Sequence, residues 1–116
     1  MHTVNLAEKF RLFNDYCNPR VIGEINDFRV KAVKLKGQFV WHHHRHEDAV
    51  VEGTLRMRFR DREAIVHQGE LVIVPHGVEH MPVADEEVHI TLLEPKTTLN
   101  TGNVRNERTV RQLEHI

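Results

Sequence analysis

The sequence predicts an all-β fold, a barrel or jelly roll preceded by a short N-terminal helix. Three observations lead to this prediction. Val, Ile and Leu alternate with charged residues from Val21 to Leu93, short turn signals separate these runs, and the 116 residues suffice for one hydrophobic core. Many short strands with closely spaced turns are typical of β architectures that limit exposed edges. We expect one domain over 1–116, with a helical arm at 1–20, a barrel at 21–95 and an extension at 96–116.

The predicted helix spans residues 5–13. Asn5 can cap its first turn, and Glu8 occupies the capping-box position. Leu6, Phe10 and Phe13 would then share one apolar stripe of the helix. The dipeptide Asn18-Pro19 marks the end of this arm.

The strands follow between turn signals. Phe28, Val30 and Ala32 share one parity while Val33 and Leu35 take the other, which predicts a bulge or a change of buried face. The segment 55–60 is apolar on one side and all arginine on the other, so we expect its arginines to form a solvated outer face. Further strands are predicted at 64–67, 71–74 and 87–93, with a turn at 85–87 before the last one.

Composition and charge exclude several function classes. The net charge is −1 and 28% of residues are charged, which describes a globular protein without general affinity for polyanions, so nucleic acid is not an expected partner. No apolar run approaches the roughly 18 residues of a membrane span, and the polar N-terminus lacks a signal peptide's apolar segment. We therefore expect no membrane partner and a cytoplasmic location. Cys17 is the single cysteine, which favours a structural, half-buried thiol.

Imidazoles gather in the segment 41–48, Trp-His-His-His-Arg-His-Glu-Asp. Residues two apart on a strand point the same way, so His42, His44 and, if the strand continues, His46 would project from one face. Two imidazoles on one strand are already partly oriented to bind a divalent transition metal. In the segment 69–80, a buried strand ends in a sharp turn, and His80 follows where the chain could return toward the same cavity.

These residues resemble the two motifs of the cupin superfamily, in particular those of small single-domain cupins of the cupin 2 conserved barrel type. The second motif is matched by Gly69, Pro75, Gly77 and His80, although Ala84 stands where the fuller motif has Asn. The first is matched by Gly37, His42, His44 and Gly53, with one residue fewer after Gly37. The resemblance covers roughly residues 28–95. It implies a double-stranded β-helix (jelly-roll) barrel that holds a metal through His42, His44 and His80.

The first motif departs from the family pattern where the family has a metal-binding Glu. The segment between His44 and Gly53 is two or three residues too short, and no acidic residue has the family spacing. Three interpretations stay open: Glu47 or Asp48 reaches the metal from a shorter loop, His46 replaces the carboxylate, or that ligand is missing. Such a site suits Fe, Ni, Mn, Cu or Zn, and the sequence does not rank these divalent metals.

Three functions are compatible with the resemblance. The first is a metal-dependent oxygenase, isomerase or lyase of a small polar metabolite, in which Glu47 or Asp48 is a further ligand or a general base. The second is a binding or sensor barrel that holds a small molecule without chemistry, and the third is a degenerate structural barrel without metal. We expect a homodimer, because small barrels often cover exposed strands by pairing.

Overall fold

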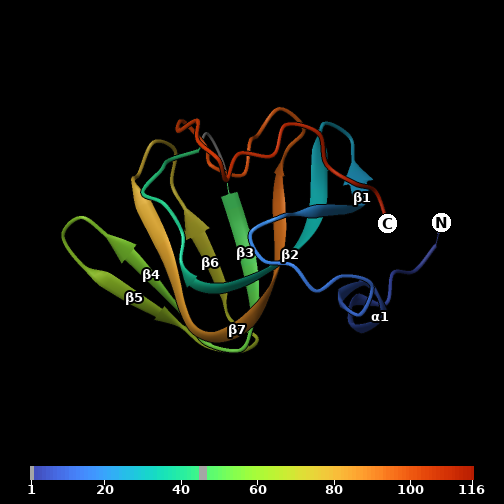
Figure 1. Cartoon of the computed structure of the whole chain (residues 1–116), viewed down its shortest axis with the longest axis horizontal. Helices are drawn as coiled ribbons and strands as arrows, with labels where there is room; N and C mark the ends of the chain where they lie inside the picture. The colour runs from blue at the N-terminus through green and yellow to red at the C-terminus, as the bar shows by residue number, and fades with distance from the viewer. Residues whose placement is uncertain (1, 45–46) are drawn as a thin grey trace.

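The computed structural model describes residues 2–44 and 47–116, and of Glu47 the backbone alone. Within these residues the chain forms one short helix, α1 (Leu6–Phe10), and a seven-stranded antiparallel sheet that curls into a barrel (Figure 1). The strands are β1 (Arg20–Ile25), β2 (Phe28–Gln38), β3 (Glu47–Glu52), β4 (Leu55–Phe59), β5 (Glu63–Val66), β6 (Leu71–Val74) and β7 (His80–Pro95). The predicted all-β jelly-roll barrel with a short N-terminal helix is confirmed. The assignment of 1–116 to one domain stays a prediction.

The long strand β7 connects the parts of the barrel. Its first residues pair with β4, and its second half lies between β2 and β3, in the order β1-β2-β7-β3-β6. The predicted turn at 85–87 is wrong, because β7 continues through it. These three exposed acidic residues form a bulge there, since Leu35 pairs with Val88 but Gly37 pairs with Ala84.

Both faces of β2 are buried. Val33 and Leu35 belong to the core inside the barrel, whereas Ala32 packs outside it with Phe10 and Phe13 of the N-terminal arm. The pairing of β2 with β7 is continuous from Phe28 to Leu35. The change of parity predicted near residue 32 is therefore a change of buried face and not a bulge against β7.

The helix begins as predicted and ends early. The Glu8 amide donates to the Oδ1 atom of Asn5 at 3.0 Å, which caps the first turn. The helix stops at Phe10, and Leu6 is 44% exposed, so the expected stripe reduces to Phe10 and Phe13. The Lys34 ammonium donates to the Phe13 carbonyl at 2.6 Å and ties the arm to β2 beyond the helix.

The last segment of the chain, 96–116, runs over the top of the barrel in Figure 1. Its end returns to β1, where the Val21 amide donates to the Glu114 carbonyl at 2.9 Å and the Ile116 amide donates to the Val21 carbonyl at 3.1 Å. The extension therefore packs across one end of the barrel and does not project away from it.

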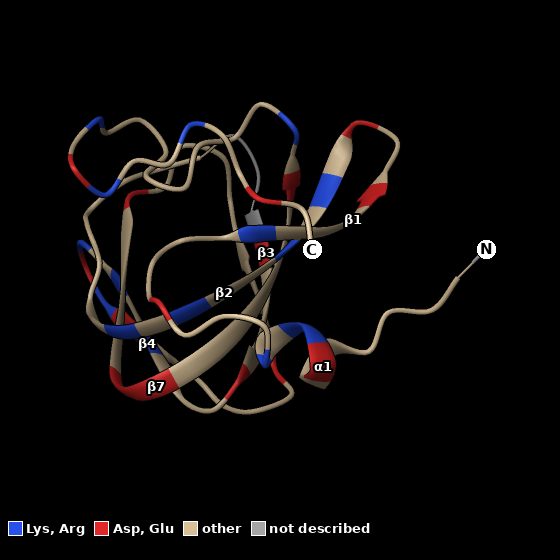
Figure 2. Cartoon of the chain, turned by 45° about the vertical axis from the view of Figure 1, so that its right-hand side comes forward, with Lys and Arg blue, Asp and Glu red and all other residues tan. Residues whose placement is uncertain are grey.

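The outer surface carries charges of both signs. Leu55 and Met57 of β4 are buried, whereas Arg58 is exposed with its guanidinium 5.8 Å from the Trp41 ring centre. Segments of Lys and Arg and segments of Asp and Glu are interspersed along the chain (Figure 2). Among the described residues, no helix has the length and apolar character needed to span a bilayer.

Candidate metal centre

Backbone pairing brings two of the histidines together. The His42 amide donates to the His80 carbonyl at 3.0 Å, and the His80 amide donates to the His42 carbonyl at 2.8 Å. His80 is the first residue of β7, but His42 lies in an isolated bridge and not in a regular strand. The strand predicted for the histidine-rich segment is therefore wrong. His42 and His44 nevertheless point into the same cluster, as residues two apart on a strand would.

The side chains of His42, His44 and His80 form one buried cluster. Ring centres lie 4.7 Å apart for His42 and His44 and 4.3 Å apart for His42 and His80. The three residues are 3%, 6% and 0% exposed, respectively, and one ring nitrogen of each lies within 4.8 Å of the others. The residues that the sequence singled out as a metal-binding trio thus share one place in the fold.

Hydrogen bonds fix the tautomer of two of these rings. The Nδ1 atom of His42 lies 2.7 Å from the Val40 carbonyl, and the Nδ1 atom of His80 lies 2.9 Å from the Val78 carbonyl. A carbonyl oxygen only accepts, so each Nδ1 carries a proton, and in the neutral ring Nε2 is the atom that can bind a metal. Metal-binding histidines are held in this way, and the cluster therefore fits a divalent transition metal.

The turn of the second motif holds His44. The Gly77 amide donates to the His44 carbonyl at 3.0 Å, and the Val78 amide donates to the Pro75 carbonyl at 3.2 Å. Gly77 has a φ of +75°, a conformation that glycine adopts without steric cost. The Pro-x-Gly segment thus both delivers His80 to the cluster and supports the loop that carries His44.

A buried ion pair adjoins the cluster, and the sequence reasoning missed it. The Lys31 ammonium lies 3.2 Å from Oε1 of Glu94, and Oε2 of Glu94 lies 3.8 Å from Nε2 of His44. The sequence did contain a signal for it, because both residues have the same parity as the strand residues that face the barrel interior. Lys31 precedes Val33 and Leu35 on β2 at that parity, and Glu94 follows Ile90 and Leu92 on β7. The strand predicted at 87–93 ended one residue before Glu94.

The remaining candidate ligands are not part of this trio. Asp48 alternates on β3 with the buried Ala49 and Val51, so it lies on the outer face of the strand together with Val50. Among the described residues, the group whose possible ligand atoms all lie within 4.8 Å of one another includes neither Asp48 nor the buried Glu94. His46 and the side chain of Glu47 lie outside the described residues.

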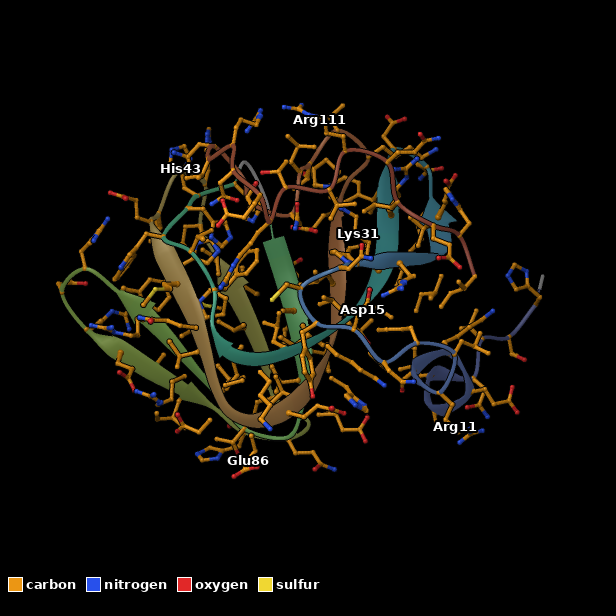
Figure 3. All side chains as sticks on the ribbon, in the orientation of Figure 1. Arg11, Asp15, Lys31, His43, Glu86 and Arg111 are labelled. Atoms are coloured by element: carbon orange, nitrogen blue, oxygen red, sulfur yellow. The ribbon has the colours of Figure 1, made fainter. Side chains whose placement is uncertain are left out.

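The cluster lies between two cavities. Inside the barrel, a cavity of about 40 Å³ is lined by apolar side chains together with Cys17, His42, Glu94 and Asn100. Outside, an open pocket of about 240 Å³ is lined by His43, His44, His76, Thr98 and Arg105. His43 lies at the top of the molecule in Figure 3, and its amide donates to the Asn103 side chain at 2.9 Å. The C-terminal segment therefore forms one wall of a polar entrance.

Comparison with known proteins identifies the family. A cupin-2 domain containing protein from Shewanella frigidimarina is 46% identical, and the match covers 81% of this chain and 95% of that one with a TM-score of 0.79. The chain belongs to the cupin superfamily. No protein-family model matches this cupin.

Two other proteins are similar to this cupin. The protein NMB1881 from Neisseria meningitidis is 28% identical, with a TM-score of 0.74, over 82% of this chain and all of that one. The protein YdbB from Bacillus subtilis is 35% identical over 63 residues, which are 51% of this chain and 56% of YdbB. The cupin thus spans little more than half the length of this curated relative.

Proposed function

We propose that His42, His44 and His80 hold a divalent transition metal in the cupin barrel, and that the protein is a metal-dependent cupin acting on a small polar metabolite. The observation that carries this proposal is the tautomer of His42 and His80, whose Nδ1 protons are donated to backbone carbonyls. Such hydrogen bonds leave Nε2 lone pairs inside a buried cluster of three imidazoles. Metal-binding histidines commonly donate Nδ1–H to a backbone carbonyl and ligate through Nε2, which is the arrangement that His42 and His80 offer.

The donor set suits iron, nickel, manganese, copper or zinc. Such a metal would act as a Lewis acid and leave positions open for a substrate. The protein contributes a rigid frame, because the two backbone bonds between His42 and His80 and the Gly77–His44 bond fix the ligands before binding. Preformed ligands lose little conformational entropy when they bind.

The polar pocket supports a small polar ligand. His43, His76 and Arg105 offer hydrogen-bond donors in its lining, which also includes His44. The interior cavity of about 40 Å³ holds little more than a few water-sized molecules, so a substrate would approach from the polar side. The oxygenase, isomerase and lyase reactions all fit this arrangement.

Anomalous scattering from crystals soaked with Co²⁺, Ni²⁺ or Zn²⁺ tests the metal site. A single peak bounded by His42, His44 and His80 is expected, and a metal-loaded crystal with no peak there would refute the proposal. A metabolite screen then separates chemistry from binding. Product formation supports an enzyme, whereas tight retention without turnover favours the binding or sensor barrel.

A further inference from the structure

Lys31 and Glu94 place two opposite charges inside the barrel, where the adjacent inward positions of β2 and β7 are apolar. Lys31 pairs with Leu92 across the β2–β7 ladder, so the side chain of Glu94, two residues further along β7, reaches it diagonally on the inner face. The side chains of Lys31 and Glu94 are 1% and 2% exposed. Lys31 is labelled in Figure 3, within the body of the molecule.

A buried ion pair of this kind adds little to the stability of a fold. Removing both charges from water costs free energy that their attraction rarely returns in full, and apolar side chains of similar volume often serve the fold as well. The neighbouring inward positions, Val33, Ile90 and Leu92, are filled in that apolar way. The position of the pair beside the three histidines therefore suggests a role in the site.

The two carboxylate oxygens of Glu94 face different groups. Oε1 lies 3.2 Å from the Lys31 ammonium, whereas Oε2 lies 3.8 Å from Nε2 of His44. Two ligand atoms that each lie about 2.1 Å from one metal ion are at most about 4.2 Å apart. The spacing between Oε2 and Nε2 therefore lets both atoms ligate the same metal. Glu94 is not in the group of atoms that all lie within 4.8 Å of one another, so its carboxylate would move toward the ion on binding.

We propose that Glu94 supplies the carboxylate ligand of the metal centre, with Lys31 as the residue that positions it. This inference rests on the proposed metal site at His42, His44 and His80. The ligand would come from the last strand of the barrel and not from the shortened segment between His44 and Gly53. The Lys31 ammonium also donates to the Thr98 carbonyl at 3.4 Å, which links the carboxylate to the wall of the polar pocket.

Cobalt is a suitable probe, because its visible spectrum reports the ligand set in the absence of any activity assay. The variants are Glu94→Gln and the doubly neutral Lys31→Met/Glu94→Gln, which leaves no unpaired buried charge. Glu87→Gln is the matched control. Glu87 lies on the same strand and its carboxylate also faces a histidine, with 2.8 Å between its Oε2 and Nε2 of His89, but outside the site.

We expect wild type and Glu87→Gln to bind Co²⁺ with the same affinity and spectrum. Glu94→Gln and the double variant should bind it at least about tenfold more weakly, with a changed visible spectrum. Recovery of wild-type affinity and spectrum in the double variant would assign Glu94 a structural role and overturn the proposal. Unchanged binding by Glu94→Gln would also overturn the proposal that Glu94 is a ligand, but it would not contradict the three-histidine site. Wild-type protein that binds no Co²⁺ would overturn the proposed function and this inference together.

A second measurement does not depend on whether the variants fold. A crystal structure of Co²⁺-loaded wild type should place a Glu94 oxygen at about 2.0–2.2 Å from the ion. An ion held by the three histidines with the Glu94 carboxylate remaining out of reach would contradict the proposal.

Discussion

His42 and His80 exchange two backbone hydrogen bonds, of 3.0 Å and 2.8 Å, although 37 positions separate them in the sequence. The bridge places the two residues side by side through main-chain atoms, and their ring centres lie 4.3 Å apart. A substitution of either side chain keeps the main-chain groups that make these two bonds. The candidate metal site can therefore be tested by substitution of its side chains.

His80→Ala should abolish stabilisation by metal. A ligand that binds only the folded state raises its stability by mass action, so Co²⁺ should raise the Tm of wild type and not that of the variant. The measurement is thermal unfolding followed by circular dichroism with and without Co²⁺. His67→Ala, at an exposed turn position, is the control and should retain the wild-type response. An equal rise in Tm for His80→Ala would contradict the assignment of His80 as a ligand.

Gly102→Ala should loosen the C-terminal segment from the histidine loop. A Cβ atom at this position would lie 2.2 Å from the His43 carbonyl oxygen, at a φ of +58°. We expect a loss of about 1–3 kcal/mol in the free energy of unfolding. Gly69→Ala separates the two causes, because Gly69 has a φ of +81° but no atom within 4 Å of an added Cβ. Equal losses in urea titrations of the two variants would show that the contact with His43 has no importance.

Asp15→Asn should weaken the fold at neutral pH more than at acid pH. The hydrogen bond from Arg20 holds the pKa of the Asp15 carboxyl below its ordinary value. The stabilisation is then fully present above the unfolded-state pKa of about 3.9 and is lost as the pH falls through the lower folded-state value.

Because Asp15 is half exposed, the expected loss at about pH 7 is only about 0.2–1 kcal/mol. Urea titrations at about pH 7 and about pH 3 measure the difference, with Asp61→Asn in the exposed turn after β4 as control. A loss that stays constant across this pH range would contradict the role of the Arg20 hydrogen bond.

Ile73→Glu should disrupt the expected homodimer. Leu71 and Ile73 of the edge strand β6 are 55% and 62% exposed, and Val50, which pairs with Leu71, is 46% exposed. An apolar outer face at a sheet edge is a surface that a second copy can cover. Light scattering should give a dimer for wild type and a monomer for Ile73→Glu. A monomeric wild type at high concentration would refute this expectation.

Much of the fold could be predicted from local patterns. The alternation of Leu55 and Met57 with arginines, and the Asn5 cap, each depend on near neighbours in the sequence and are present as expected. The turn predicted at 85–87 failed because three acidic residues mark a bulge in a long strand as readily as a turn. Only the pairing of β7 with β2 distinguishes the two, and this pairing is a tertiary property.

The candidate site divides in the same way. His42, His44 and His80 were found because their motifs are compact and ordered along the chain. Glu94 was missed because it lies far from both motifs, and a single charged residue at the end of an apolar strand usually faces solvent. Its burial depends on Lys31, a residue from another strand, and on the inner face that the two share.

The metal content of protein purified without metal-affinity chromatography tests the central claim most directly. Wild type and His44→Ala, prepared in parallel, are reconstituted with the same divalent metal. Elemental analysis compares their metal content, and titration with that metal compares their affinities. We expect about one metal per wild-type chain and a loss of at least about tenfold in the affinity of the variant. Equal metal content and affinity in the two proteins would contradict the assignment of the three histidines as the metal centre.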